Sequence, residues 1–302
     1  MYLCSYLQNQ TEKYGVLTAD QQKVIDLVSA ERELFSNPLL PSSLNEAISN
    51  PTSQDRLREV YQKVVENENL DDTPIKDIEL LAPIIKPNRN IFCLGINYRE
   101  HAYEFEKTTD ASKAIPNDPI VFSKLPTTVI GPNQPILSHS QVTSELDYEG
   151  EFAIIIGKEG TYIPKEDAFD YIFGYTIIND VTARDLQRKH KQWLLGKGLD
   201  SFGPMGPYIV TKDQLQDPQN LSLRTKVNGE IRQNSNTELL IFDIPTIIET
   251  LSKGITLKPG DIIATGTPKG VGMGFEPPKF LKPGDIVEIE IEGIGVLKNH
   301  VI

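Results

Sequence analysis

The sequence predicts an α+β fold rich in β-structure, in which a small N-terminal α+β domain precedes a larger domain. Short apolar runs in residues 1–35 are typical of a hairpin or a small sheet. Residues 42–69 show the apolar spacing of helices instead. From residue 221 onward, short apolar runs separated by turn-forming residues predict mainly strands.

The helical segment and the stretch after it define the expected domain boundary. Ser43 is placed to cap one helix, and Pro51 is placed to open a second one. Residues 80–87, which are punctuated by prolines, then lead into the rest of the chain. We therefore expect one domain at residues 1–85 and another at residues 86–302.

Length, charge and cysteine content limit the classes of function. The 302 residues can bury a full core, and the formal net charge of −12 disfavours binding to nucleic acid or to anionic membranes. Two cysteines are too few for a disulfide framework, and no apolar run approaches the length of a spanning helix. Because the start of the chain does not look like a secretory signal, we expect a cytoplasmic protein that acts on a small molecule.

The first candidate functional groups follow a strand that is expected to end at Gly95. His101 and Glu104, three residues apart, would share one face of a short helix. Glu104 could polarise the imidazole, so that His101 acts as a base near neutral pH, although the pair also fits a solvated helix turn. A short strand over residues 120–126, which stops at the proline, would place Lys124 at its end, either in a site or on the surface.

Three carboxylates are candidate metal ligands. Glu149 and Glu151 begin an apolar run, so a strand would place both carboxylates on one face, together with Asp147. Asp180 lies where a second apolar run ends, before a helix that Thr182 could cap. Converging carboxylates need a cation, and oxygen ligands without nearby Cys or His favour Mg²⁺ or Mn²⁺. Glu149 and Glu151 could instead face solvent on an antiparallel strand.

Candidate cationic and amide groups follow Asp180 in the chain. Arg184, Gln187 and Lys191 have the spacing of one helix side, which is either directed at a site or solvated. Lys197 lies between two glycines, so its backbone can approach a ligand closely and its ammonium could neutralise a carboxylate or a developing enolate. The glycines also fit a plain tight loop.

Further elements can be predicted from turn and cap signals. A helix over residues 164–173 would link the two carboxylate-bearing strands, and Asn228-Gly229 predicts a hairpin turn. Asp243 is placed to cap another helix. Residues 264–272 contain too many glycines for regular structure and could offer hydroxyls and amides to a ligand.

Three motifs, in this order, resemble the fumarylacetoacetate hydrolase family. They occupy residues 146–151, 179–187 and 266–272. The resemblance extends from about residue 86 to the C-terminus, and the preceding part resembles the extra domain of the longer bacterial members. It implies a mixed α+β roll around a metal site, in a protein that usually forms a homodimer.

The resemblance also implies roles for individual residues. The matching Glu149, Glu151 and Asp180 would bind Mg²⁺ or Mn²⁺. The segment from Gly95 to Glu104 matches Gly-x-Asn-Tyr-x-x-His-x-x-Glu, whose His-Glu pair sits on a lid and activates water in hydrolytic relatives. The family's lysine loop matches around Lys197, which makes it the third candidate catalytic residue beside His101 and Glu104.

Four residues are implied to bind the substrate. The resemblance directs Arg184 toward the carboxylates of the metal site and Gln187 toward the substrate. Thr267 would contact the substrate carboxylate, and Lys124 would line the site.

A metal next to cationic and amide groups suits a small 2-oxo acid, because charge can be held as an enolate forms. We place decarboxylation of oxaloacetate first, since the longer bacterial relatives are associated with it. Hydrolysis of acylpyruvates, with water activated by His101, is the alternative, followed by catechol-pathway hydratase or isomerase activity. A metal-binding scaffold protein is the alternative outside the enzymes.

Overall fold

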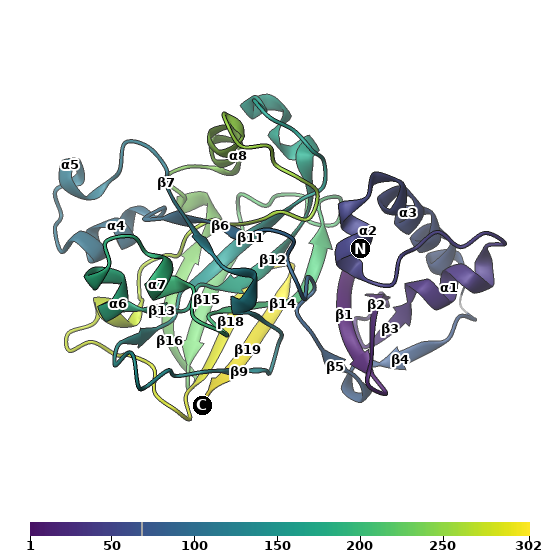
Figure 1. Ribbon diagram of the computed structural model, residues 1–302, viewed down its shortest axis with the longest axis horizontal. Coiled ribbons are helices and arrows are strands. Elements are labelled where there is room, and N and C mark those ends of the chain that lie inside the picture. The colour runs from purple at the N-terminus through teal and green to yellow at the C-terminus, as the bar shows by residue number, and fades with distance from the viewer. Residues whose placement is uncertain (68) are drawn as a thin grey trace.

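A 12-stranded sheet runs through the computed structural model, which describes residues 1–67 and 69–302 (Figure 1). Its main path is β4 (Asp72–Pro74), β3 (Lys23–Asp26), β2 (Thr11–Leu17), β1 (Tyr2–Gln8), β14 (Gly203–Thr211), β12 (Ile172–Asn179), β11 (Gly150–Ile156), β17 (Ile262–Ala264), β6 (Ile91–Gly95) and β7 (Ile120–Lys124). Off this path, β5 (Glu79–Leu80) pairs with β1, and β8 (Val129–Ile130) pairs with β14. The predicted β-rich α+β fold is confirmed.

A second sheet packs against the large one and forms the C-terminal part of the fold. Its order is β16 (Glu230–Asn236), β15 (Ser222–Val227), β18 (Ile286–Ile291), β19 (Gly295–Val301) and β9 (Pro135–Ile136). Asn228 and Gly229 both have positive φ, at 52° and 80°, as the predicted hairpin turn between β15 and β16 requires. A short pair, β10 (Leu146–Asp147) with β13 (Thr182–Ala183), lies beside the two sheets.

The α-helices are α1 (Leu27–Leu34), α2 (Leu44–Ser49), α3 (Pro51–Glu66), α4 (Arg99–Glu106), α5 (Ala111–Ala114), α6 (Arg184–Lys189), α7 (Leu194–Lys197) and α8 (Ile244–Ser252). Helices α1 to α3 pack their apolar residues against strands of the large sheet. The 3₁₀-helices are Ile75–Asp77, Pro126–Thr128, Lys165–Tyr171, Thr237–Leu239 and Gly272–Gly274. Ser43 caps α2, Pro51 opens α3 and Asp243 caps α8, as predicted. In the described part of the chain, none of the helices combines the length and the apolar character needed to cross a bilayer.

Some local predictions are wrong. The small sheet expected over residues 1–35 ends at Asp26, whose side chain accepts a hydrogen bond from the Ser29 amide and caps helix α1. Residues 164–173 do not form one helix, because the 3₁₀-helix ends at Tyr171 and the next residues join β12. Pairing of Ile172 with β11 draws the chain into the sheet there. Thr182 does not cap α6, since it lies in β13 and its hydroxyl donates a hydrogen bond to the Asp180 carbonyl.

The N-terminal segment is continuous with the large sheet. Its first strand, β1, pairs with β14 so that Tyr2 lies opposite Val210. One apolar cluster contains Leu3 and Leu57 from this segment together with Met205 from the rest of the chain. The domain boundary near residue 85 stays a prediction; it falls between β5 and β6, while β1 hydrogen-bonds to a strand beyond it.

Asn97 fastens the end of β6 to two other segments. Its buried side chain accepts a hydrogen bond from the Phe242 amide at 2.8 Å and donates one to the Thr265 carbonyl at 2.8 Å. We expect Asn97→Ala to lower the free energy of unfolding by about 2–4 kcal/mol, because buried backbone groups lose their partners. Denaturant unfolding measures this, with the exposed Asn90→Ala as the matched control, for which a change within about 0.5 kcal/mol is expected. Equal effects of the two substitutions would contradict the prediction.

Candidate metal centre and active site

The register of β11 and β12 brings three carboxylates together. The strands are antiparallel with Gly150 opposite Asn179, so the start of β11 lies beside the end of β12. Glu149, Glu151 and Asp180, here called the acidic triad, are all buried. Each offers one oxygen that lies within 4.8 Å of the oxygens of the other two. The expected convergence of the three side chains is therefore present in the structure.

Neighbouring groups hold these carboxylates in place. The Asn179 side chain accepts a hydrogen bond from the Glu149 amide at 3.0 Å, and the Gly266 amide donates to Glu151 Oε2 at 2.9 Å. Asp147, which the sequence places on the same face, does not belong to the triad. It accepts hydrogen bonds from Arg184 Nε at 2.8 Å and from the Gly272 amide at 2.6 Å.

Three buried cations contact the carboxylates. Lys197 Nζ lies 2.8 Å from Glu149 Oε2 and 2.7 Å from Asp180 Oδ2. Lys124 Nζ lies 2.6 Å from Asp180 Oδ1, and Arg184 Nη2 lies 2.7 Å from Glu149 Oε1. Lys124 is thus a buried residue of the site and not a surface lysine at a strand end.

The electrostatics of the three carboxylates differ. Burial, and then the charges of Asp180 and Glu149, raise the pKa of Glu151 well above its usual range. Burial alone would also raise the pKa of Glu149, but Lys197 and Arg184 outweigh it and hold that pKa well below its usual range. Glu151 is therefore the carboxylate whose negative charge is least compensated.

The donor set and its charge fit a divalent ion. Four carboxylates and three cations, all buried, meet here: Asp147, Glu149, Glu151, Asp180, Lys124, Arg184 and Lys197. When all are ionised, one negative charge is in excess, and the triad presents only oxygen ligands. A bound Mg²⁺ or Mn²⁺ would turn this excess into a positive charge, which suits an anionic substrate.

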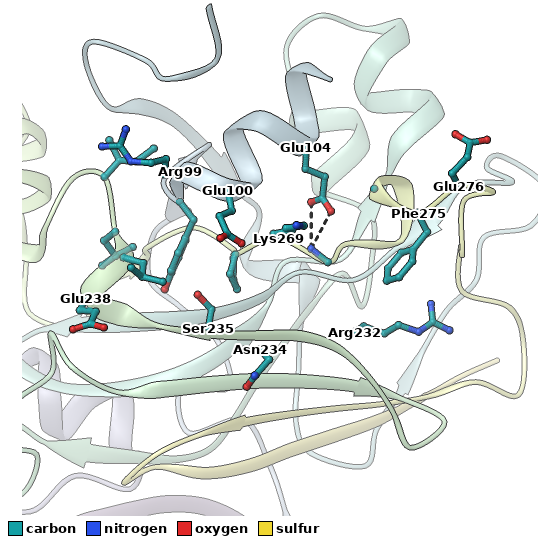
Figure 2. Close-up of a pocket in the computed structure, with 17 residues that line it drawn as sticks. Arg99, Glu100, Glu104, Arg232, Asn234, Ser235, Glu238, Lys269, Phe275 and Glu276 are labelled. Carbon is teal, nitrogen blue, oxygen red and sulfur yellow. Dashed lines mark hydrogen bonds between the residues drawn. The ribbon is translucent and has the colours of Figure 1, made fainter. Parts of the chain in front are cut away.

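Helix α4 carries the predicted catalytic pair, His101 and Glu104, here called the dyad. His101 Nδ1 lies 3.0 Å from Glu104 Oε2. The Gly270 amide donates to Glu104 Oε1 at 3.0 Å, a contact that is dashed in Figure 2. Because Glu104 occupies Nδ1, Nε2 is the ring nitrogen that remains for a substrate. A Cβ atom at Gly274 would lie 2.0 Å from Glu104 Oε1, so only glycine lets this loop pack directly on the carboxylate.

The two faces of α4 border two different cavities. Arg99, Glu100 and Glu104 line the cavity of about 840 Å³ seen in Figure 2. His101 and Phe105 line a second cavity together with Glu149, where the free space is only about 10 Å³. Such a volume holds about one water molecule, so a substrate fits there only after lining residues move, and α4 carries two of them. The larger cavity contains none of the three triad residues.

Three of the four predicted substrate-binding residues line the small cavity, and Lys124 does not. Gln187 and Thr267 border it together with Arg184, and Gln187 Oε1 accepts a hydrogen bond from Arg184 Nη1 at 3.2 Å. The Thr267 hydroxyl donates to the Gly150 carbonyl at 3.0 Å. Lys191 is exposed beyond the end of α6, so the positive helix side expected from the sequence stops short of it.

Gln233 is a site residue that sequence reasoning missed. It is buried on β16, where its Oε1 accepts from the Gly150 amide at 3.0 Å and its Nε2 donates to the Thr267 hydroxyl at 2.8 Å. It connects the hairpin to the start of β11. Its local sequence gives no signal, because the contact joins segments more than 80 residues apart.

Residues 90–302 match the sequence model of the family described as "Fumarylacetoacetate (FAA) hydrolase C-terminal". The chain belongs to this enzyme family, and its buried acidic triad can hold a metal ion. The resemblance inferred from the motifs is confirmed. The individual catalytic and substrate-binding roles stay predictions.

Three similar proteins cover almost the whole chain. Oxaloacetate tautomerase YisK of Bacillus subtilis is 50% identical over 94% of this chain and 95% of its own length. The structure of a fumarylacetoacetate hydrolase from Exiguobacterium antarcticum has a TM-score of 0.81 at 39% identity, covering 100% of this chain and 99% of the other. Maleylpyruvate hydrolase from Sphingobium sp. SYK-6, in complex with manganese(II) and pyruvate, has a TM-score of 0.78 at 29% identity, with the same coverage.

Substitution of Glu151 by Gln separates metal binding from stability. A carboxyl whose pKa is raised by folding contributes stability at low pH that is lost as pH rises through the raised pKa. In the absence of metal, Glu151→Gln should therefore become more stable than the wild type as pH rises. Its Tm should exceed that of the wild type by about 2–4 °C for each kcal/mol of repulsion removed.

The same substitution should weaken Mn²⁺ binding at least about 100-fold, because one of three carboxylate ligands is lost. Calorimetry and thermal melts across a pH series measure both effects. Glu159→Gln, at an exposed carboxylate, is the matched control and should change neither. Unchanged Mn²⁺ affinity in Glu151→Gln would show that the triad is not the metal site.

Proposed function

We propose that this chain is a Mg²⁺- or Mn²⁺-dependent enzyme that interconverts the keto and enol forms of oxaloacetate. The observation that carries the proposal is the 50% identity, over 94% of the chain, to a protein named an oxaloacetate tautomerase. The buried cations beside the acidic triad support it, because they suit a dianionic 2-oxo acid. When held by Glu149, Glu151 and Asp180, the metal ion would supply Lewis acidity at the keto oxygen.

The side chains provide the proton transfer. His101 Nε2 takes a proton from C3 of the substrate, and the electron pair of that C–H bond forms the C2–C3 double bond of an enolate. The nearby ammonium of Lys197 and guanidinium of Arg184 stabilise the negative charge on O2. His101 then returns its proton to O2, which completes the enol, and Glu104 keeps the ring in the orientation that both steps need.

Decarboxylation of oxaloacetate, which the sequence alone placed first, remains the second candidate. Here the C3–C4 bond breaks, CO₂ leaves, and the electron pair forms the enolate of pyruvate, which His101 protonates at C3. The same cations would stabilise that enolate. The complex of the Sphingobium enzyme with manganese and pyruvate fits this candidate, whose product is pyruvate. Pyruvate is equally a product of acylpyruvate-type hydrolysis, which the name of that enzyme keeps as a third candidate.

The test follows enol absorbance and pyruvate release from oxaloacetate in parallel, with Mn²⁺ or Mg²⁺ and with an enzyme-free metal control. We expect keto–enol conversion far above the control and little pyruvate. His101→Asn should lower kcat about 10²–10⁴-fold by removing the proton carrier. The exposed His190→Asn is the matched control and should retain full activity.

Three other results would redirect the assignment. Pyruvate release that keeps pace with enol conversion would support decarboxylation. Turnover of acetylpyruvate but not of oxaloacetate would support hydrolysis. Unchanged activity in the Glu149→Ala, Glu151→Ala double variant would contradict all three reactions at this site.

Gly274→Ala tests the part played by Glu104. The added methyl group must displace the Glu104 carboxylate from His101 and from the Gly270 amide. We expect kcat to fall roughly 10–100-fold, while Tm changes little because only the end of a flexible side chain moves. Gly254→Ala is the matched control, since its methyl group would meet open space. Wild-type kcat in Gly274→Ala would show that the dyad geometry does not matter.

A further inference from the structure

Trp193, the only tryptophan of the chain, lies between helix α4 and the sheet. Its ring centroid is 6.2 Å from that of Phe105 on α4 and 5.1 Å from that of Phe122 on β7. A Cβ atom at Gly95 would lie 2.5 Å from Trp193 Cζ3, so the indole rests directly on the end of β6. Trp193 is thus an aromatic support under the face of α4 that carries His101.

The segment above this support, residues 99–114, is here called the lid. It contains α4 and α5 and packs through a small apolar cluster that is separate from the two large cores. Ala102 and Ala114 are the fully buried lid residues of this cluster, and Phe105 and Trp193 pack at its side. Because few apolar contacts hold the lid, its closed position depends strongly on each of them.

Trp193 is also the residue from which the turn carrying Lys197 begins. Its carbonyl accepts hydrogen bonds from the Gly196 amide at 2.9 Å and from the Lys197 amide at 3.0 Å. Lys197 Nζ lies 5.0 Å from the centroid of the Phe122 ring, which Trp193 also contacts. Trp193 therefore supports the lid through its ring and holds the backbone of Lys197 through its carbonyl group.

We propose that Trp193 is a positioning residue that couples lid closure to the carboxylate site. When the lid rests on the indole ring, α4 places His101 over the site, and the same residue holds the turn that directs Lys197 at Glu149 and Asp180. The proposal rests on the proposed function in that it concerns the same site. It adds a residue outside the dyad, the triad and the cations.

Hydrogen exchange of the full-length chain with Mg²⁺ tests the proposal without any assumption about the reaction. We expect amides of the lid to exchange roughly tenfold faster in Trp193→Ala, the effect of losing aromatic contacts worth about 1.4 kcal/mol. Trp193→Phe, which keeps a ring on the support, should restore most of the protection. Exchange in β11 should stay unchanged in both variants.

Phe105→Leu removes a contact from the lid side and should reproduce the faster lid exchange without altering the turn of Lys197. Tyr162→Ala, which truncates an aromatic side chain that is 75% exposed, is the control and should leave the lid unaffected. In kinetics, Trp193→Ala should lower kcat about tenfold or more, whereas the Mg²⁺ affinity should hold because no carboxylate is touched.

Two outcomes would overturn the proposal. Lid exchange at the wild-type rate in both Trp193→Ala and Phe105→Leu would show that the lid does not depend on this support. Faster exchange throughout, β11 included, would show that Trp193 only stabilises the fold. Faster lid exchange in a protein that does not turn over oxaloacetate would refute the proposed function and leave the coupling in place.

Discussion

Mutual repulsion among buried carboxylates is the constraint on which the rest of the site depends. The register of β11 and β12 forces Glu149 and Asp180 together, and Glu151 follows on the same strand. Such a group is stable in a protein interior only if cations lie close to it. Other segments supply them: β7 ends in Lys124 and α7 ends in Lys197, so ion pairs help to hold these elements in place.

The glycine-rich loop at residues 264–272 and helix α4 also border the carboxylate site. Glu104 joins them, because one carboxylate contacts His101 and the Gly270 amide at once. The hydrogen bond to the loop therefore orients the imidazole, and it also holds α4 in its closed position. The His101–Glu104 pair and the carboxylates thereby lie on separate elements. They come together only when α4 is closed, so the site is complete only in that position.

The sequence predicts much of this, and its failures have physical causes. Strand periodicity indicates that Glu149 and Glu151 share a face, and cap and turn residues locate several helices and a hairpin correctly. Burial of Lys124 and the contacts of Gln233 depend on pairing between distant segments, which local pattern does not encode. The continuity of β1 with β14 is a contact of the same kind. The wrong helix at residues 164–173 shows tertiary pairing overriding a local helix signal.

The small free volume beside the carboxylates has a kinetic consequence. With about 10 Å³ available, substrate must enter and product must leave while lining residues such as those of α4 are displaced, so every catalytic cycle includes an opening and a closing. The opening rate is then a ceiling on kcat that no improvement in the chemical step can raise. Substrates whose chemical step is faster than this opening would all reach the same maximal rate, and would differ instead in the concentration needed to approach it.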